Sequence, residues 1–230
     1  MKKEKPILFS TEMVRAIIEG RKSQTRRVVK PQREAASFKI AVMPDGTKMP
    51  FGIDEEEAML DYIKCPYGQP GDMLWVKEMF YAYGMWVKNG RTKSGKQKWV
   101  FIDTTAAGEY RYFDNPPAEV LPNSDRETMG WFKRNSLFMP YKACRIKLKV
   151  TDRRVERLND TSEEDAIAEG VIGVQRAGGY GYGLSKDWDY KFPMHEPTRI
   201  MAYKRLWESI NGKGSWEKNE RVWVISFERL

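Results

Sequence analysis

Histidine and cysteine are scarce in this 230-residue chain, and their scarcity excludes several kinds of site. His195 is the one histidine, so a Ser–His–Asp or Cys–His mechanism would have to use it. It lies in the Pro-flanked segment PMHEPT, which is typical of a surface or structural position. The two cysteines, Cys65 and Cys144, are too far apart for a zinc motif or a disulfide framework. We therefore expect no metal and no cofactor, and any catalysis must use Lys, Thr, Ser, Tyr or carboxylates.

Long apolar runs are also absent. No stretch of about 18 apolar residues is present, so we expect no membrane span. The N-terminal segment MKKEKPILFSTEMV starts with lysines, but its apolar part is too short and interrupted for a signal peptide. With 41% hydrophobic and 31% charged residues, the composition is typical of a soluble globular protein. We expect a cytoplasmic protein, and the sequence leaves its oligomeric state open.

Positive charge is concentrated in two stretches of the chain, whose net charge is +8. Residues 1–33 contain ten Lys and Arg against three acids, and residues 142–157 contain seven against two. The remaining residues are together net acidic. If the two stretches meet in space, they form a positive surface for a polyanion such as RNA. Two unrelated solvated faces are the alternative.

The stretch GRKSQTRR, from Gly20 to Arg27, combines cations with two hydroxyl side chains. It follows a predicted helix over residues 11–19, which Ser10 caps and Gly20 ends. A brief extended segment comes next and closes at Pro31. The stretch has three interpretations: a solvated basic loop, a nucleic-acid clamp, or an active site whose nucleophile is a hydroxyl.

A strand with one cationic face is predicted in the segment CRIKLKV. Its apolar residues alternate with its basic ones, so the two sets point to opposite faces. The apolar set is Cys144, Ile146, Leu148 and Val150, and the candidate nucleic-acid-binding set is Arg145, Lys147 and Lys149. The segment TSEEDAIAEG then predicts a helix with a capping box of Ser162 and Asp165.

The other elements are mostly short strands. The segment from Met73 to Tyr83 predicts one buried strand, and RVWVISFERL predicts a final one. A third helix is expected between Thr198, as its cap, and Gly212, and the Gly- and Tyr-rich residues 174–197 predict a long loop. Strands outnumber helices without regular alternation. This favours an α+β protein with a small, closed or strongly curved sheet and helices at its rim.

Four blocks of the sequence resemble the ASCH family, a branch of the PUA-like β-barrels. They are PILFSTEMVRAIIEGRKSQTRR, PGDMLWVKE, ACRIKLKVTDRRVERLNDTSEEDAIAEGV and WVISFERL, and they cover less than half of the chain. The match is greatest with the long, prophage-type members. The resemblance implies a single α+β domain over residues 1–230, built as a curved PUA-like β-barrel with short helices at its rim. It also implies large loop insertions at residues 34–64, 81–138 and 174–197.

The same resemblance implies an activity, that of 4-acetylcytidine amidohydrolase. The G-x-K-x-x-T element of that enzyme falls on Lys22 and Thr25, and alignment of the capped helix places its glutamate at Glu169. Thr25 would then be the nucleophile and Lys22 its base, while Glu169 would shuttle protons or hold the lysine. Nearby arginines would lower the pKa of Lys22. The residues expected to bind substrate are Arg21, Arg26, Arg27 and Glu78.

Two functional classes remain open at this point. The first is a hydrolase that acts on RNA or a modified nucleoside. The second is a non-catalytic nucleic-acid-binding or phage-accessory protein, and the family also includes a ribonuclease-type activity. The substrate, the role of the insertions and catalysis itself stay open. Convergence of Lys22, Thr25 and Glu169 in one pocket would favour the enzyme.

Overall fold

The computed structural model describes residues 4–30, 32, 37–42, 48–53, 59–62, 64–176, 179–184 and 196–230. Over these residues the chain is sheet-rich with few helices, which confirms the predicted α+β class. It divides into two compact units. Unit 1 comprises Met1–Lys5, Glu12–Leu74 and Lys147–Leu230, and unit 2 comprises Pro6–Thr11 and Trp75–Ile146. The expected insertion at 81–138 lies within unit 2, while the expectation of a single domain stays a prediction.

A five-stranded sheet has the order β1-β6-β10-β13-β2. Its strands are β1 (Glu4–Leu8), β2 (Gln24–Val28), β6 (Met73–Lys77), β10 (Lys147–Arg157) and β13 (Arg221–Arg229). Strand β13 pairs antiparallel with both β10 and β2, and its register with β2 places Ile225 opposite Thr25. Residues Val222 to Ile225 are all buried, so both faces of β13 are covered. This agrees with the apolar run that predicted the strand.

Three α-helices accompany this sheet: α1 (Thr11–Ile18), α2 (Glu163–Ala168) and α3 (Arg199–Asn211). Their positions confirm the three predicted helices. Ser162 accepts a hydrogen bond from the Asp165 N–H at 3.1 Å, and Asp165 accepts one from the Ser162 N–H at 3.2 Å, which completes the predicted capping box. Thr198 caps α3, which Gly212 ends with a φ of 96°. None of the helices in the described ranges has the length and apolar character needed to cross a membrane.

Two smaller sheets lie within unit 1. One has the order β3-β4-β5, with β3 (Ser37–Val42), β4 (Lys48–Ile53) and β5 (Met59–Tyr62), and the other pairs β11 (Ile172–Arg176) with β12 (Gly179–Gly183). The prediction of a loop over 174–197 is therefore wrong for this hairpin. Its glycines resemble loop signals, but Gly181 and Gly183 are buried opposite Val174 and Ile172. Residues 185–195, and with them His195, lie outside the described residues.

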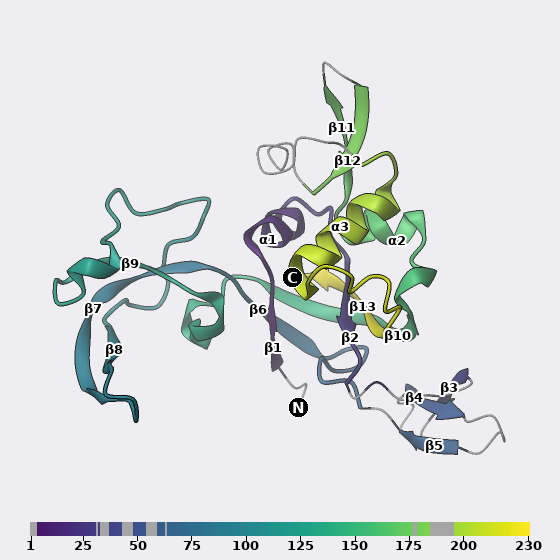
Figure 1. Cartoon of the computed structure of the whole chain (residues 1–230), viewed down its shortest axis with the longest axis horizontal. Helices are drawn as coiled ribbons and strands as arrows, with labels where there is room; N and C mark the ends of the chain where they lie inside the picture. The colour runs from purple at the N-terminus through teal and green to yellow at the C-terminus, as the bar shows by residue number, and fades with distance from the viewer. Residues whose placement is uncertain are drawn as a thin grey trace. The chain divides into compact units, whose positions relative to one another are not determined.

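Unit 2 contains a three-stranded antiparallel sheet with the order β8-β7-β9 (Figure 1). Its strands are β7 (Phe80–Arg91), β8 (Gln97–Asp103) and β9 (Gly130–Arg134). One strand was expected from Met73 to Tyr83, and this is wrong, because β6 ends at Lys77 and β7 begins at Phe80. The strand is interrupted at Glu78. The Glu78 N–H donates a hydrogen bond to the sulfur of Met139 at 3.2 Å and not to a neighbouring strand. Short 3-10 helices occur at Asn123–Asp125, Ser136–Phe138, Tyr141–Ala143 and, in unit 1, Leu158–Asp160.

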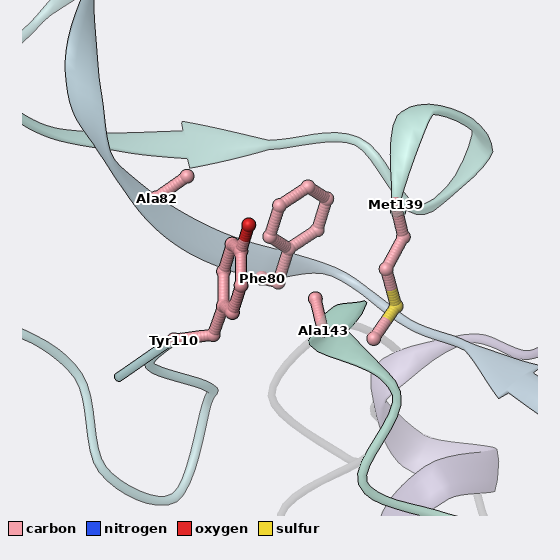
Figure 2. Close-up of a cluster of buried hydrophobic side chains, with 5 residues drawn as sticks. All are labelled: Phe80, Ala82, Tyr110, Met139 and Ala143. Atoms are coloured by element: carbon pink, nitrogen blue, oxygen red, sulfur yellow. The ribbon is translucent and has the colours of Figure 1, made fainter. Parts of the chain in front are cut away.

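A small apolar core lies against this sheet (Figure 2). It consists of the buried side chains of Phe80, Ala82, Tyr110, Met139 and Ala143, against which Phe101 and Tyr112 pack. The hydroxyl of Tyr110 reaches the edge of the core and donates to Asp103 at 2.6 Å, so the buried ring leaves no unpaired hydroxyl. Unit 2 thus has a core of its own.

The Ser162 cap offers a direct test of how α2 begins. Replacing Ser162 with alanine should lower the free energy of unfolding by about 1 kcal/mol, because the Asp165 N–H loses its acceptor. The Ser162→Thr variant keeps a hydroxyl and should lie much closer to the wild type. Urea unfolding measures both changes. Wild-type stability of the alanine variant would contradict the cap.

Candidate functional site: a buried charge network in unit 1

The predicted residues Lys22 and Glu169 form a buried ion pair. The Lys22 Nζ lies 2.5 Å from the Glu169 Oε2 and also donates to the Glu169 backbone oxygen at 3.0 Å. Both side chains are almost completely buried, with exposed fractions of 0% and 2%. A buried charge is costly unless it is paired and hydrogen-bonded. Each of the two buried side chains therefore compensates the charge of the other, because neither is exposed to water.

The second oxygen of Glu169 is also engaged. Its Oε1 accepts a hydrogen bond from Arg26 Nη1 at 3.3 Å and one from the Tyr203 hydroxyl at 3.3 Å. The Arg26 guanidinium also lies over the Tyr203 ring, 5.7 Å from its centre. Glu169 is thus held from β2 and from α3 at once. Its carboxylate has a fixed orientation toward Lys22.

Arg26 extends the network to two further carboxylates. Its guanidinium is fully buried and contacts Glu156 at 2.6 Å and Asp165 at 2.8 Å. Gln24 donates to Asp165 at 2.9 Å, and Arg154 binds Asp165 and Glu156, each at 2.8 Å. Three cations and three carboxylates therefore alternate in one cluster, which we call the Glu169 network. Its members are Lys22, Arg26, Arg154, Glu156, Asp165 and Glu169, with Gln24 and Tyr203 as neutral partners.

Two helix ends bring Lys22 and Glu169 together. The Ala16 carbonyl of α1 accepts from the Arg21 and Lys22 N–H groups, at 2.8 and 3.1 Å. The N–H of Ser23 donates to Ala168 of α2 at 2.9 Å. Glu169 caps α2, and the next residue, Gly170, has a φ of 101°. A Cβ at Gly170 would also lie 3.1 Å from the Ala16 Cβ, so a glycine is needed for conformation and space.

Burial is the main influence on the acid–base properties of Lys22. It lowers the pKa of Lys22 below the ordinary lysine value, Glu169 opposes this effect, and Arg27 and Arg26 add to it. The cations that the sequence pointed to are thus the smaller contributors. Burial also raises the pKa of Tyr203, and Glu169 raises it further, so its hydroxyl keeps its proton and acts as a donor. A lysine with a lowered pKa is suited to act as a base.

Thr25 lies on β2 between two members of this network, Gln24 and Arg26, and forms no hydrogen bond with the network. Its side chain is completely buried, and its Oγ1 has no hydrogen-bond partner among the described residues. Strand alternation places Thr25 and Arg27 on one face of β2, and Gln24 and Arg26 on the other. A buried hydroxyl without a partner is unusual in a folded protein. Of the three predicted catalytic residues, Lys22 and Glu169 are in contact, and Thr25 presents an unengaged hydroxyl.

The other arginines of this stretch have backbone partners. Arg21 donates to the carbonyl oxygens of Gly170 at 2.9 Å and Leu184 at 3.3 Å, and pairs with Glu19 at 2.5 Å. Arg27 donates to the Arg26 carbonyl oxygen at 3.1 Å. Arg26 was expected to bind substrate, but its guanidinium is bound to three carboxylates. A role in positioning Glu169 therefore fits Arg26 better than direct substrate contact.

Glu78 belongs to a separate cluster in unit 2. Arg145 binds it through two hydrogen bonds of 2.9 Å, and binds Asp114 through two of 2.8 Å. The Arg145 guanidinium also lies 4.0 Å from the centre of the Tyr112 ring. Burial raises the pKa of Glu78, and Arg145 opposes the shift. The substrate-binding role of Glu78 stays a prediction.

The predicted cationic face of β10 is largely neutralised. The alternation in burial is confirmed, since Ile146, Leu148 and Val150 are buried, but the predicted start of the strand is wrong, because β10 begins at Lys147 and Arg145 precedes it. Lys147 pairs with Glu4 at 3.0 Å and Lys149 with Glu228 at 2.7 Å. With Arg145 bound to two carboxylates, each candidate nucleic-acid-binding residue has an acidic partner. Nucleic-acid binding through these three residues stays a prediction, and their pairing lowers the net charge that they offer.

Sequence reasoning missed several members of the Glu169 network. Arg154 and Glu156 stand at alternate positions of the segment RRVER, which places both on one face of β10. Tyr203 had no such signal, because an aromatic residue on an amphipathic helix is typical of a core. Over the described ranges, no group of three or more His, Cys, Asp or Glu residues is arranged to hold a metal ion. No protein-family model, curated protein or solved structure matches this chain.

The buried pair can be tested with a double-mutant cycle. Lys22→Met should lower the free energy of unfolding by about 3 kcal/mol, because it leaves the buried Glu169 carboxylate with less compensation. Adding Glu169→Gln removes that charge and should restore part of the stability. Urea unfolding of both single variants and of the double variant measures the coupling. A coupling energy below about 0.5 kcal/mol would contradict the pair.

The network also predicts a pH dependence. Burial opposes the charge of Asp165, but hydrogen bonds and charges from Gln24, Arg26 and Arg154 lower its pKa from 3.8 to about 2. Since the folded-state pKa lies below the unfolded one, the stabilisation is present above pH 4 and is lost as the pH falls toward 2. Asp165→Asn should therefore flatten the fall in stability over this range. The matched control, Asp152→Asn at an exposed site, should keep the wild-type slope, and equal slopes for all three proteins would refute the assignment.

Proposed function

We propose that the chain is an amidohydrolase that removes the acyl group from N4-acylated cytidine, built on a PUA-like barrel of the ASCH type. The observations that carry the proposal are the buried Lys22–Glu169 pair and the buried, unengaged hydroxyl of Thr25, three residues after Lys22. The barrel is supported by the five-stranded sheet, because each of its strands lies in or overlaps one of the four blocks that resemble the family. The substrate class comes from the resemblance, and the chemistry of the residues supports the hydrolysis of an amide.

The chemistry of amide hydrolysis suits these three residues. A threonine hydroxyl is a weak nucleophile until a base takes its proton. Lys22 fits this role because burial lowers its pKa, so its free-base form is more accessible than that of an exposed lysine. Arg27, on the same face of β2 as Thr25, and Arg26, on the opposite face, both add to the lowering of the pKa of Lys22. A hydroxyl without a partner has no existing hydrogen bond to break before it binds substrate.

The proposed reaction has two steps. The Thr25 oxygen attacks the acyl carbon while Lys22 accepts the hydroxyl proton, and the bond from that carbon to N4 then breaks. The leaving N4 takes the proton from Lys22, which leaves an acyl ester on Thr25. Water, deprotonated by Lys22, attacks the ester carbon, the bond from that carbon to the Thr25 oxygen breaks, and Lys22 returns the proton to that oxygen, which releases the acid and the free enzyme. Glu169 accepts a hydrogen bond from Lys22 throughout and stabilises its protonated form.

Turnover of 4-acetylcytidine, followed by absorbance, tests the proposal. We expect the wild type to deacetylate it and Thr25→Ala to lose at least about a thousandfold in kcat/KM, because the nucleophile is gone. Thr25→Ser should keep part of the activity, since the oxygen remains. The Thr25→Ala variant should stay folded, because the hydroxyl that it removes has no hydrogen-bond partner, so no buried polar group is left unsatisfied.

Ser23 provides the matched control. It lies two residues from Thr25 and is exposed, so Ser23→Ala should keep the wild-type rate. If Ser23→Ala is inactive and Thr25→Ala is active, the assigned nucleophile is wrong. If the wild type deacetylates nothing, the amidohydrolase proposal fails as a whole.

A further inference from the structure

A two-stranded ribbon in unit 2 has no role in the proposed reaction. Strand β9 pairs with β7 only between Phe80 and Gly84, whereas β8 pairs with β7 from Gly84 to Arg91. Beyond the end of β9, strands β7 and β8 therefore continue as a ribbon of two strands (Figure 1). A turn over residues 92–96 closes it.

The end of this ribbon is strongly basic. Residues 88–98, with the sequence KNGRTKSGKQK, contain five Lys and Arg and no acidic residue. All five are exposed: Lys88, Arg91, Lys93, Lys96 and Lys98. Lys88 pairs with the exposed Glu127 at 3.0 Å, but the other four form no ion pair with a described carboxylate. This contrasts with Arg145, Lys147 and Lys149, whose charges are compensated within the fold.

The basic tip is ordered by its own hydrogen bonds. The Thr92 N–H donates to the Lys96 oxygen at 2.8 Å, and the Gly95 N–H donates to the Thr92 oxygen at 2.9 Å. The Lys96 N–H donates to the Thr92 Oγ1 at 3.0 Å, and Gly95 has a φ of 79°. The cations are thus carried on a defined turn, so less conformational entropy is lost when they bind a partner.

Aromatic residues brace the base of the ribbon and are already covered. The Arg134 guanidinium lies 4.4 Å from the centre of the Trp86 ring and 4.2 Å from that of Phe101. The Arg126 guanidinium lies 5.3 Å from the centre of the Trp99 ring. Single-stranded nucleic acids bind through bases stacked on open aromatic faces. Because these faces carry arginines instead, the ribbon is better suited to contacts with phosphates than with unpaired bases.

We propose that the β7–β8 ribbon binds duplex DNA by placing its basic tip in the major groove, where it contacts phosphates on both sides. Alternation places Lys88 on the face that carries Trp86 and Lys98 on the face that carries Val100, so charge points to both faces of the ribbon. Paired strands lie about 4.8 Å apart, and the major groove of B-form DNA, about 12 Å wide, admits a two-stranded ribbon. This inference does not depend on the amidohydrolase proposal.

Fluorescence anisotropy with a 20-base-pair DNA duplex tests the proposal, using the full chain over a range of salt concentrations. We expect binding that weakens steeply with salt, because each phosphate bound by a cation releases counterions. The double variant Lys93→Gln/Lys96→Gln should reduce the slope of log K against log salt by about 2, because each neutralised phosphate contributes roughly 0.9 to that slope. The matched control Lys213→Gln/Lys218→Gln removes two exposed charges from unit 1 and should keep the wild-type slope.

Several results would overturn the proposal. They are the absence of binding at low salt, an unchanged slope in Lys93→Gln/Lys96→Gln, or an equal reduction of the slope in the control variant. The proposal would also be overturned if the protein bound single-stranded DNA or duplex RNA of the same sequence, or phosphatidylserine vesicles, more tightly than it binds the DNA duplex. Circular dichroism of both double variants confirms that they are folded, as expected for changes at exposed side chains.

Discussion

The burial of the Glu169 carboxylate is the constraint on which the described arrangement of unit 1 depends. A carboxylate removed from water must be matched by charge and hydrogen bonds, and here Lys22, Arg26 and Tyr203 supply them. This requirement ties the end of α2 to β2 and α3. Arg26 in turn needs Glu156 and Asp165, so one buried charge organises side chains from four elements. Burial lowers the pKa of Lys22 although Glu169 opposes the shift, and the proposal that Lys22 acts as a base depends on this lowering.

Positive charge in this protein serves two different purposes. In the Glu169 network and along β10, cations are bound to carboxylates and contribute to the fold. At the tip of the β7–β8 ribbon, cations are exposed and four have no described acidic partner. A count of charges along the sequence cannot separate these cases. It favoured residues 1–33 and 142–157 and passed over residues 88–98, because acids elsewhere in the remaining chain hid their charge.

Predictions from the sequence succeeded where the signal is local. The capping box of Ser162 and Asp165, the Thr198 cap and the alternation in CRIKLKV each depend on residues within one turn or one strand. They failed where a partner decides the outcome. The strand predicted from Met73 to Tyr83 is interrupted at Glu78, whose N–H donates to Met139 and whose carboxylate binds Arg145, and the glycine-rich segment after residue 171 pairs into the β11–β12 hairpin.

The sequence by itself determined the α+β class and the three helices, but it placed Thr25 in a basic loop, whereas Thr25 lies buried on strand β2. Only the tertiary structure decided that Lys22 is buried, that Glu169 is its partner and that Tyr203 and Arg26 hold the second oxygen. Lys22 and Glu169 are 147 positions apart, and Arg26 and Glu169 are 143 apart. Helix caps and strand alternation follow from neighbouring residues, whereas burial and ion pairing depend on which distant segments fold against each other.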